Sequence, residues 1–199
     1  MSKRPPILLS GEFIRLRPIA VSDAAFTLRW RQSSRAINLN KGAETLEAQR
    51  DWIVGRPDSE YNFIIELLDG RAVGMLSLVG VDPINRRAEP ARFLIGEEEL
   101  ARGIPVAVES MKLLYEFAFD RLQLARVYGT VVSDNLAMYK WQTYLGMKEE
   151  GRLRNHYFIN NHFQDAICVG LLEAEYRRVT LPRMRVLMAV GRIATNGEA

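Results

Sequence analysis

The sequence predicts an α/β fold built on a mixed sheet flanked by helices. Strand-like and helix-like segments alternate along the chain, and three strand-like segments follow one another in its middle. Apolar residues make up 48% and charged residues 26% of the 199 residues, which is typical of globular proteins. At this length one domain buries about 70% of the surface of its unfolded chain, so we expect a single main core.

The first part of the chain is predicted to form one strand and two helices. Residues 12–19 alternate apolar and polar side chains, as a half-buried strand does. Ser22 or Asp23 then caps a helix that runs to about residue 36. Thr45 begins a second helix, which ends near residue 53.

The middle of the chain is predicted to form three antiparallel strands. Residues 61–68 and 71–81 flank Asp69-Gly70, a strong hairpin signal. A third strand follows over 88–95. Pro90 cannot donate to a ladder, so this strand is expected to lie at an edge or to be bulged.

The second half alternates helix and strand. Pro105 suits the first position of a long helix that runs to about residue 122. Ser133 or Asp134 caps a later helix, and Gly146 ends it. The strands expected around these helices are 126–132, 152–159 and 166–172.

The end of the chain has a different character. Residues 177–193 contain five arginines and no acidic residue, and Pro182 suits the start of a helix. We therefore divide the chain into a domain over 1–176 and a basic helical tail over 177–199. The tail is expected to pack on the domain or on a second subunit, which makes a homodimer a candidate assembly. Contact with an anionic surface and a disordered end are the alternatives.

Composition excludes several kinds of site. Cys168 is the only cysteine, so the chain has no intrachain disulfide and no multi-cysteine metal site. His156 and His162 are the only histidines, and we expect no metal. Aromatic residues do not interleave with a basic stripe, so no nucleic-acid platform is expected.

Targeting signals are not expected either. The first apolar stretch is too short for a signal peptide, and no apolar run approaches the length of a membrane span. These features predict a soluble, cytoplasmic protein without a membrane partner.

Three stretches hold candidate chemistry. Over 97–109 a strand ends and a helix begins, with Arg102-Gly103 between them, so free N–H groups and a guanidinium can bind phosphate. Over 133–152 Tyr139 and Gln142 share one helix face. Over 86–92 Glu89 can take a proton from an ammonium group. Ordinary packing or surface salt bridges remain the alternative for each stretch.

Taken in order, these stretches resemble the GNAT superfamily of acetyl-CoA-dependent N-acetyltransferases. The resemblance covers about residues 10–176, and it is nearest to the branch of ribosomal-protein N-terminal, spermidine and sugar-nucleotide N-acetyltransferases. The segments that carry it are EFIRLRPIAVSDA, LRWRQ, NFIIELLDGRAVGMLSL, INRRAE, ARGIPVAVESMKLLYEFAFDRL, ARVYGTVVSDN and YLGMKEEGRLRNHYFINNHFQDAI.

The resemblance implies a mixed central sheet splayed open like a V, with acetyl-CoA in the split. The pantetheine is expected along Phe93, Leu94 and Ile95, whose backbone N–H groups stabilise the oxyanion. The remaining residues that the resemblance places against the cofactor are Arg102, Gly103, Val106, Ala107, Asn135 and Gln142.

Two positions depart from the family pattern. Pro105 replaces a glycine of the phosphate loop and removes one N–H donor, although Val106 and Ala107 can still donate. Gln142 stands where the family often has a general-acid tyrosine, so Tyr139 is the substitute that we expect. Protonation of the thiolate by water, or by Tyr144, is the alternative.

The predicted activity is acetyl transfer from acetyl-CoA to a primary amine, with Glu89 as the base. Arg29 and Arg31 lie on the helix that lines the acceptor side in the family, and Arg17 and Arg152 add positive charge. These arginines favour an amino-sugar nucleotide as acceptor. A peptide or protein N-terminus, another small amine and a polyamine are alternatives. A catalytically degenerate CoA-binding or interaction module is the alternative outside enzymes.

Overall fold

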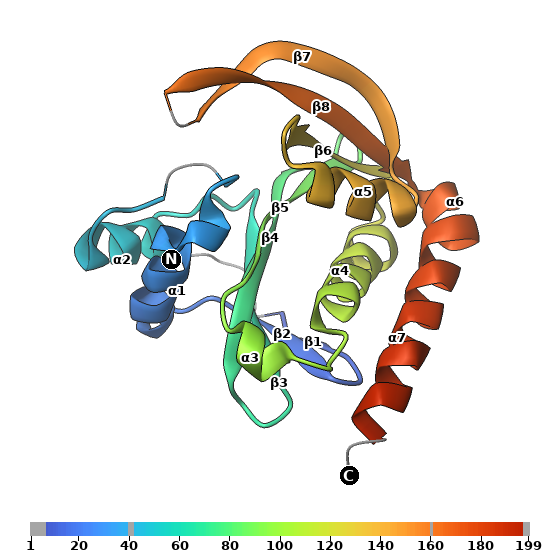
Figure 1. The fold of residues 1–199 in the computed structure, drawn as a ribbon, viewed down its shortest axis with the longest axis horizontal. Coiled ribbons are helices and arrows are strands. Elements are labelled where there is room, and N and C mark those ends of the chain that lie inside the picture. Colours follow the sequence, from blue (N-terminus) through green and yellow to red (C-terminus); the bar gives the residue numbers. More distant parts are fainter. Residues whose placement is uncertain (1–6, 40–41, 160, 197–199) are drawn as a thin grey trace.

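The computed structural model describes residues 7–39, 42–159 and 161–196, and it confirms an α/β fold with a mixed sheet. Within those residues one eight-stranded sheet has the order β1-β2-β3-β4-β5-β6-β8-β7 (Figure 1). The strands are β1 (Leu9–Ser10), β2 (Ile14–Pro18), β3 (Tyr61–Leu67), β4 (Ala72–Asp82), β5 (Arg87–Ile95), β6 (Arg126–Val132), β7 (Lys148–Ile159) and β8 (His162–Leu172). The helices are α1 (Ala24–Gln32), α2 (Leu46–Val54), α3 (Glu98–Ala101), α4 (Val106–Glu116), α5 (Leu136–Tyr144), α6 (Glu173–Glu175) and α7 (Leu181–Asn196).

Strand pairing explains why the sheet is mixed. Neighbouring strands pair antiparallel from β1 to β5 and again among β6, β8 and β7, whereas β5 and β6 run parallel. The β3–β4 hairpin turns at Asp69-Gly70, where Gly70 has a φ of 94° that most residues avoid. The predicted hairpin is therefore confirmed.

The sheet buries apolar side chains on both faces. Phe63 and Ile65 of β3 point to the larger core, which α4 covers, and Ile64 points to the smaller core under α1 and α2. Figure 1 shows α1 and α2 on one side of the central strands, and α4 and α7 on the other. Successive side chains of β3 thus alternate between the two faces of the sheet, and both faces are buried, so this strand is apolar along most of its length.

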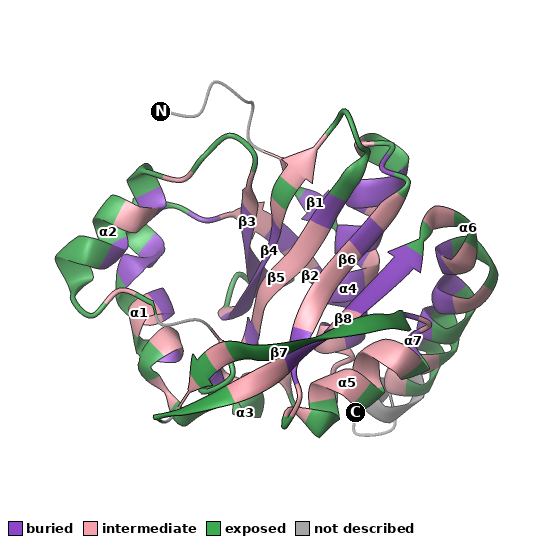
Figure 2. Cartoon of the chain, turned by 90° about the horizontal axis from the view of Figure 1, so that it is seen from above, coloured by how far each residue is buried: buried purple, intermediate pink, exposed green. Residues whose placement is uncertain are grey.

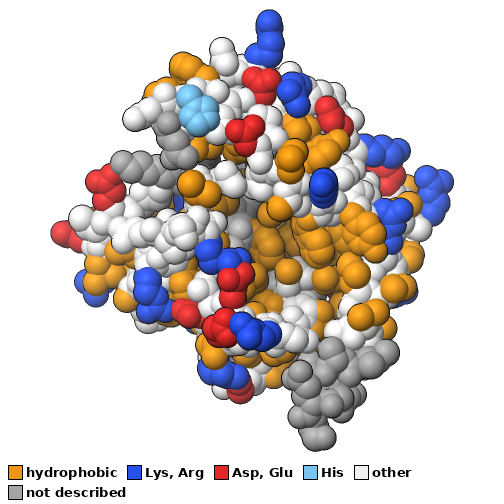
Figure 3. All heavy atoms as spheres, viewed as in Figure 1, with side chains coloured by type: hydrophobic (Ala, Val, Ile, Leu, Met, Phe, Trp, Pro, Cys, Tyr) orange, Lys and Arg blue, Asp and Glu red, His pale blue; other side chains and the backbone are white. Residues whose placement is uncertain are grey.

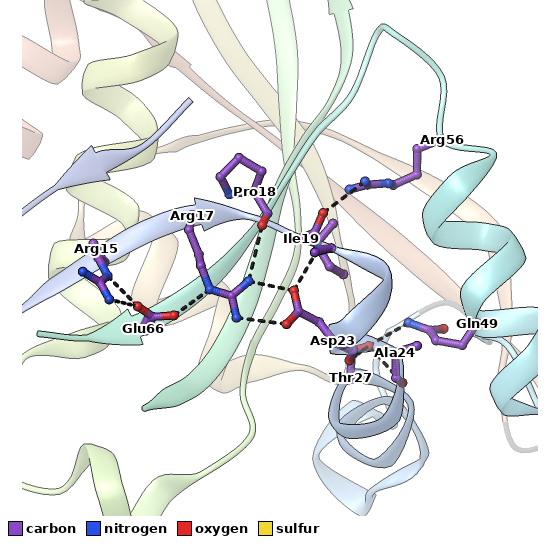
Figure 4. Close-up of polar contacts among 11 residues, drawn as sticks. Arg15, Arg17, Pro18, Ile19, Asp23, Ala24, Thr27, Gln49, Arg56 and Glu66 are labelled. Atoms are coloured by element: carbon purple, nitrogen blue, oxygen red, sulfur yellow. Dashed lines mark hydrogen bonds and ion pairs between the residues drawn. The ribbon is translucent and has the colours of Figure 1, made fainter. Parts of the chain in front are cut away.

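The first helix differs from the prediction. Asp23 is the N-cap residue of α1, but its side chain accepts no hydrogen bond from that helix: the carboxylate accepts instead from Arg17 at 2.7 and 2.9 Å and from the Ala20 N–H at 2.8 Å (Figure 4). Helix α1 also ends at Gln32 rather than near residue 36, because Ser33 is extended and a separate 3₁₀ turn follows over Ser34–Ala36. This carboxylate therefore anchors β2 to α1.

The starts of two later helices also need correction. Pro105 is the N-cap of α4 and not its first residue, and the short helix α3 precedes it without having been predicted. Helix α5 is capped by Asn135, whose side-chain oxygen accepts from the Met138 N–H at 3.2 Å, and not by Ser133 or Asp134.

The C-terminal segment packs on the molecule's own core. Side chains of Tyr176, Leu181, Met184 and Met188 join the larger core beside α4. Helix α7 runs for 16 residues. A homodimer contact through this segment stays a prediction.

Burial is unequal along the sheet (Figure 2). The central strands are largely buried, whereas β7 at the edge is exposed along nearly its whole length. In the part of the chain that the structure describes, no helix is both long and apolar enough to cross a membrane.

Candidate active site

The sheet opens between β5 and β6. These strands pair at two positions only, Arg87 with Arg126 and Ala88 with Val127, and then separate. A cavity of about 540 Å³ lies where they diverge. Figure 3 shows a hollow with apolar walls near the middle of this face. Its walls combine β5, β6, α4 and α5 with residues of α1 and α2, and Tyr157 of β7.

A bulge in β5 shapes one wall of this cavity. Leu94 pairs with Met75 and Ala91 with Ser77, so two residues of β5 stand opposite the single residue Leu76. Arg92, one of the two, has a φ of 54°. An extra residue interrupts the regular ladder, and residues 89–93 around this bulge all line the cavity.

Glu89 lies in the wall as a half-buried carboxylate. Burial raises the pKa of its carboxyl group above the ordinary value, and the charge of Arg92 offsets part of that rise. Gly129 of β6 lies beside Glu89, and a Cβ at this glycine would be in ordinary van der Waals contact with the Glu89 side chain at 3.5 Å. A carboxylate with a raised pKa, open to a cavity, suits a general base.

A second cavity of about 330 Å³ adjoins the first and shares part of its wall, including Phe93 and Met138. It brings together five of the residues that were predicted against the cofactor. They are Phe93, Leu94, Ile95, Ala107 and Asn135.

The phosphate loop only partly matches its predicted role. Arg102 and Gly103 line neither cavity, and Arg102 forms an exposed ion pair with Glu99 at 2.6 Å. Gly103, with a φ of 76°, makes the turn before α4. The N–H of Val106 donates to the Ile104 carbonyl at 2.7 Å, so this donor is already used within the loop.

Helix α5 presents a stripe of Met138, Trp141 and Gln142 to the larger cavity, and its C-cap residue Leu145 continues this stripe. The side-chain oxygen of Gln142 is buried and has no hydrogen-bond partner among the described residues. A buried, unpartnered oxygen is costly, so a ligand with a donor group is expected to reach it.

The prediction that Tyr139 is the general acid is not supported by its position. Tyr139 lies beside this stripe rather than in it, and it lines neither cavity. Its hydroxyl donates to Glu149 at 2.9 Å, which raises the pKa of the phenol. The cavity instead holds Tyr115 and Tyr157, which were not predicted.

Of the predicted substrate arginines, only Arg31 lines the cavity. Arg29, two residues away on α1, points to a different side and pairs with Glu97, because positions two apart on a helix diverge by about 200°. Arg152 is exposed and pairs with Asp165 at 3.4 Å. Arg17 is held by Asp23 and Glu66 and lies outside the cavity.

Other lining residues had not been singled out. Trp52 and Gln49 of α2 were predicted only as parts of a helix, and Arg92 only as part of a surface cluster. Tyr157 hydrogen-bonds Thr130 at 2.5 Å between their hydroxyl groups. Tyr157 lies in the final hairpin, one of the segments that resemble the family. That resemblance is the one sequence signal that could have indicated Tyr157 as a site residue.

Comparisons with known proteins agree with this geometry. The family model described as acetyltransferase (GNAT) domain matches residues 14–148. The spermidine N(1)-acetyltransferase of Escherichia coli (strain K12) is 30% identical over 118 residues, which cover 59% of this chain and 61% of that protein. The putative ribosomal N-acetyltransferase YdaF of Bacillus subtilis is 32% identical over 110 residues, 55% of this chain and 58% of that protein. The match thus spans about 60% of the length of these relatives.

Solved structures share the fold. A GCN5-related N-acetyltransferase from Brucella melitensis superposes with a TM-score of 0.76 at 19% identity, covering 93% of this chain and 87% of that one. Spermidine N-acetyltransferase from Vibrio cholerae, in complex with CoA and spermine, gives 0.74 at 22% identity, covering 84% and 99%. With the family model matching more than half of its length, this chain belongs to the GNAT acetyltransferase family.

Proposed function

We propose that this protein is an acetyl-CoA-dependent N-acetyltransferase that acts on a primary amine. The observation that carries the proposal is the half-buried Glu89 in the wall of a cavity where β5 and β6 separate. Family membership supplies the reaction class, and the cavity supplies a place for the acceptor amine beside a base.

The residues around the smaller cavity fit acetyl-CoA. Its wall along Phe93, Leu94 and Ile95 belongs to β5 after that strand has left β6, so backbone groups there are not used by the β5–β6 ladder. Asn135 and Ala107 face it from α5 and α4. These residues would hold the pantetheine arm. We assign the larger cavity to the acceptor and call it the acceptor cavity; the unpartnered side-chain oxygen of Gln142 lies in its wall.

Proton transfer falls to Glu89. Bound acetyl-CoA supplies the acetyl group as a thioester. Glu89 takes a proton from the acceptor ammonium, directly or through one water, and frees the nitrogen lone pair. The nitrogen would bond to the carbonyl carbon as the carbon–sulfur bond breaks; the nitrogen would give its second proton to solvent and the departing thiolate would take one from solvent, which leaves the amide and the free thiol. Backbone N–H groups near Leu94 would stabilise the negative charge that develops on the carbonyl oxygen. Holding both reactants in adjoining cavities lowers the entropic part of the barrier.

The first test is the melting temperature with and without acetyl-CoA. Binding to the folded state stabilises it by about 2.7 kcal/mol when the ligand is at 100 times its Kd. We expect acetyl-CoA and CoA to raise the melting temperature and ATP and NAD to leave it unchanged. A panel of primary amines is then screened for release of the CoA thiol. No thermal shift with saturating acetyl-CoA would overturn the proposal.

A CoA-binding module without catalysis is the second candidate. Two observations favour it: Gln142 stands where the family often has a tyrosine acid, and the Val106 N–H is engaged by Ile104. A thermal shift with CoA, together with no thiol release above the buffer rate across the amine panel, would select this candidate.

Fewer arginines support an anionic acceptor than the sequence suggested. An amino-sugar nucleotide remains a candidate, because Arg31 lines the acceptor cavity. Arg29 and Arg152 no longer support it. Three relatives carry the name spermidine N(1)-acetyltransferase, so spermidine belongs in the panel as well.

A further inference from the structure

The acceptor cavity carries more positive than negative charge. Arg31 of α1 and Arg92 of β5 both line it, and Glu89 is the one carboxylate among its lining residues in the described part of the chain. Glu60, behind Arg92, offsets part of this charge, and the two guanidinium groups give the cavity donors suited to an oxyanion.

Contacts with neighbouring polar side chains hold the Arg92 guanidinium in position. Its two terminal nitrogens contact the Glu60 carboxylate at 2.8 and 3.2 Å, and one of them also donates to Asn62 at 3.0 Å. Its guanidinium carbon lies 5.4 Å from the centre of the Trp52 ring. The strand bulge, where Arg92 has a positive φ, turns this side chain toward the cavity. Backbone strain of this kind is characteristic of functional sites.

Arg31 lines the same cavity from α1. Burial lowers the pKa of its guanidinium, and the charge of Arg92 lowers that pKa further. Burial is also the main cause that lowers the pKa of Arg56. The charge of Arg92 lowers that pKa further, whereas Glu60 and Asp23 raise it. The charge of Arg92 thus acts on both Arg31 and Arg56, and Arg92 itself pairs with Glu60. An anion between Arg31 and Arg92 would relieve this repulsion.

We infer that the acceptor amine also carries an anionic group, a carboxylate or a phosphate, which Arg31 and Arg92 bind while the amine faces Glu89. The inference rests on the proposed function, since it places the acceptor in the larger cavity. Guanidinium groups pair with both kinds of oxyanion through charge-assisted hydrogen bonds. Such an acceptor differs in charge from spermidine, which the names of three relatives mention.

Two matched pairs of amines test the inference. Leucine against leucinamide isolates a carboxylate, and glucosamine 6-phosphate against glucosamine isolates a phosphate. Binding of each to the protein–CoA complex is measured by calorimetry, which does not depend on turnover. We expect the anionic member of at least one pair to bind about tenfold more tightly or better. The pair that shows the preference identifies the anion.

Variants of Arg31 connect the preference to the site. Arg31→Gln should remove the preference, and Arg31→Lys, which keeps the charge, should retain part of it. Arg50→Gln is the matched control, because Arg50 is exposed on α2 and outside both cavities. Circular dichroism and the thermal shift with CoA establish that each variant is folded.

The outcomes separate this inference from the proposed function. Equal binding within both pairs, no binding by any of the four, tighter binding of spermidine, or a preference that survives Arg31→Gln overturns the anionic acceptor. An anion preference that Arg31→Gln removes supports it. If that preference appears but no amine releases CoA from acetyl-CoA, the anion site stands and the proposed acetyl transfer fails.

Discussion

At the scale of single residues, Glu89 is expected to control the pH dependence of the reaction. A base must be ionised to accept a proton, and burial raises the pKa of Glu89 above its ordinary value near 4.5. The kcat/KM of the wild type should therefore rise with pH through that raised pKa. Glu89→Gln should lower kcat/KM about 100-fold or more and remove this rise. Steady-state kinetics across the acidic range provide the measurement.

The control for this prediction is Glu99→Gln, an exposed glutamate that pairs with Arg102 outside both cavities. It should leave the pH profile unchanged. A Glu89→Gln enzyme with a wild-type profile would show that another group, or solvent, takes the proton.

The same carboxylate should reduce stability at neutral pH. Because the folded-state pKa of Glu89 is raised, its contribution to stability is greatest below the unfolded pKa and is lost as pH rises through the folded pKa. Glu89→Gln removes this loss, so the melting temperature of the variant should exceed that of the wild type near pH 7 and approach it at low pH. A lower melting temperature at pH 7 would show that Glu89 has a structural role.

At the scale of elements, one carboxylate joins α4 to the start of β2. Glu109 is 1% exposed and accepts backbone hydrogen bonds from Glu12, Phe13 and Ile14 at 2.5, 2.8 and 3.0 Å. Glu109→Ala leaves these donors without that acceptor and should lower the free energy of unfolding by about 3 kcal/mol. Urea denaturation measures the change.

Glu116→Ala on the same helix is the comparison for Glu109. Glu116 pairs with Lys112 at 2.7 Å near the surface, and such pairs contribute about 1 kcal/mol or less. Equal losses in the two variants would contradict the anchoring role of Glu109.

At the scale of the whole molecule, α7 is expected to be part of the cooperative unit rather than an appendage. Met184 is fully buried in the larger core, whereas Val186 on the same helix is 64% exposed. Met184→Ala should lower the free energy of unfolding by about 2–5 kcal/mol, and Val186→Ala should change it by about 0.5 kcal/mol or less. Chemical denaturation compares the two.

If Met184→Ala leaves the unfolding midpoint unchanged, α7 does not contribute to folding of the domain. The division of the chain at residue 176 would then describe its stability as well as its composition.

Local patterns were sufficient for most elements. Asp69-Gly70 located the hairpin because a two-residue turn has strict backbone requirements that few residue pairs meet. Thr45 located the start of α2, and its side chain does accept from the Ala48 N–H. The side chain of Asp23, a residue type that often caps helices, pairs instead with Arg17 of β2. Competition of this kind cannot be seen in a local pattern.

The sequence by itself determined the order of the longer strands and helices, though not β1 or α3, and it placed a carboxylate on β5. These features depend on side-chain period and turn chemistry along a short stretch. Only the tertiary structure decided which side chains share the cavity. It brought Arg92, Trp52 and Tyr157 in and left Arg29, Arg152 and Tyr139 out. Three features decide which side chains reach the cavity: the direction in which each helix face points, the one-residue bulge in β5, and the separation of β5 from β6. Each of them depends on packing between segments far apart in the chain.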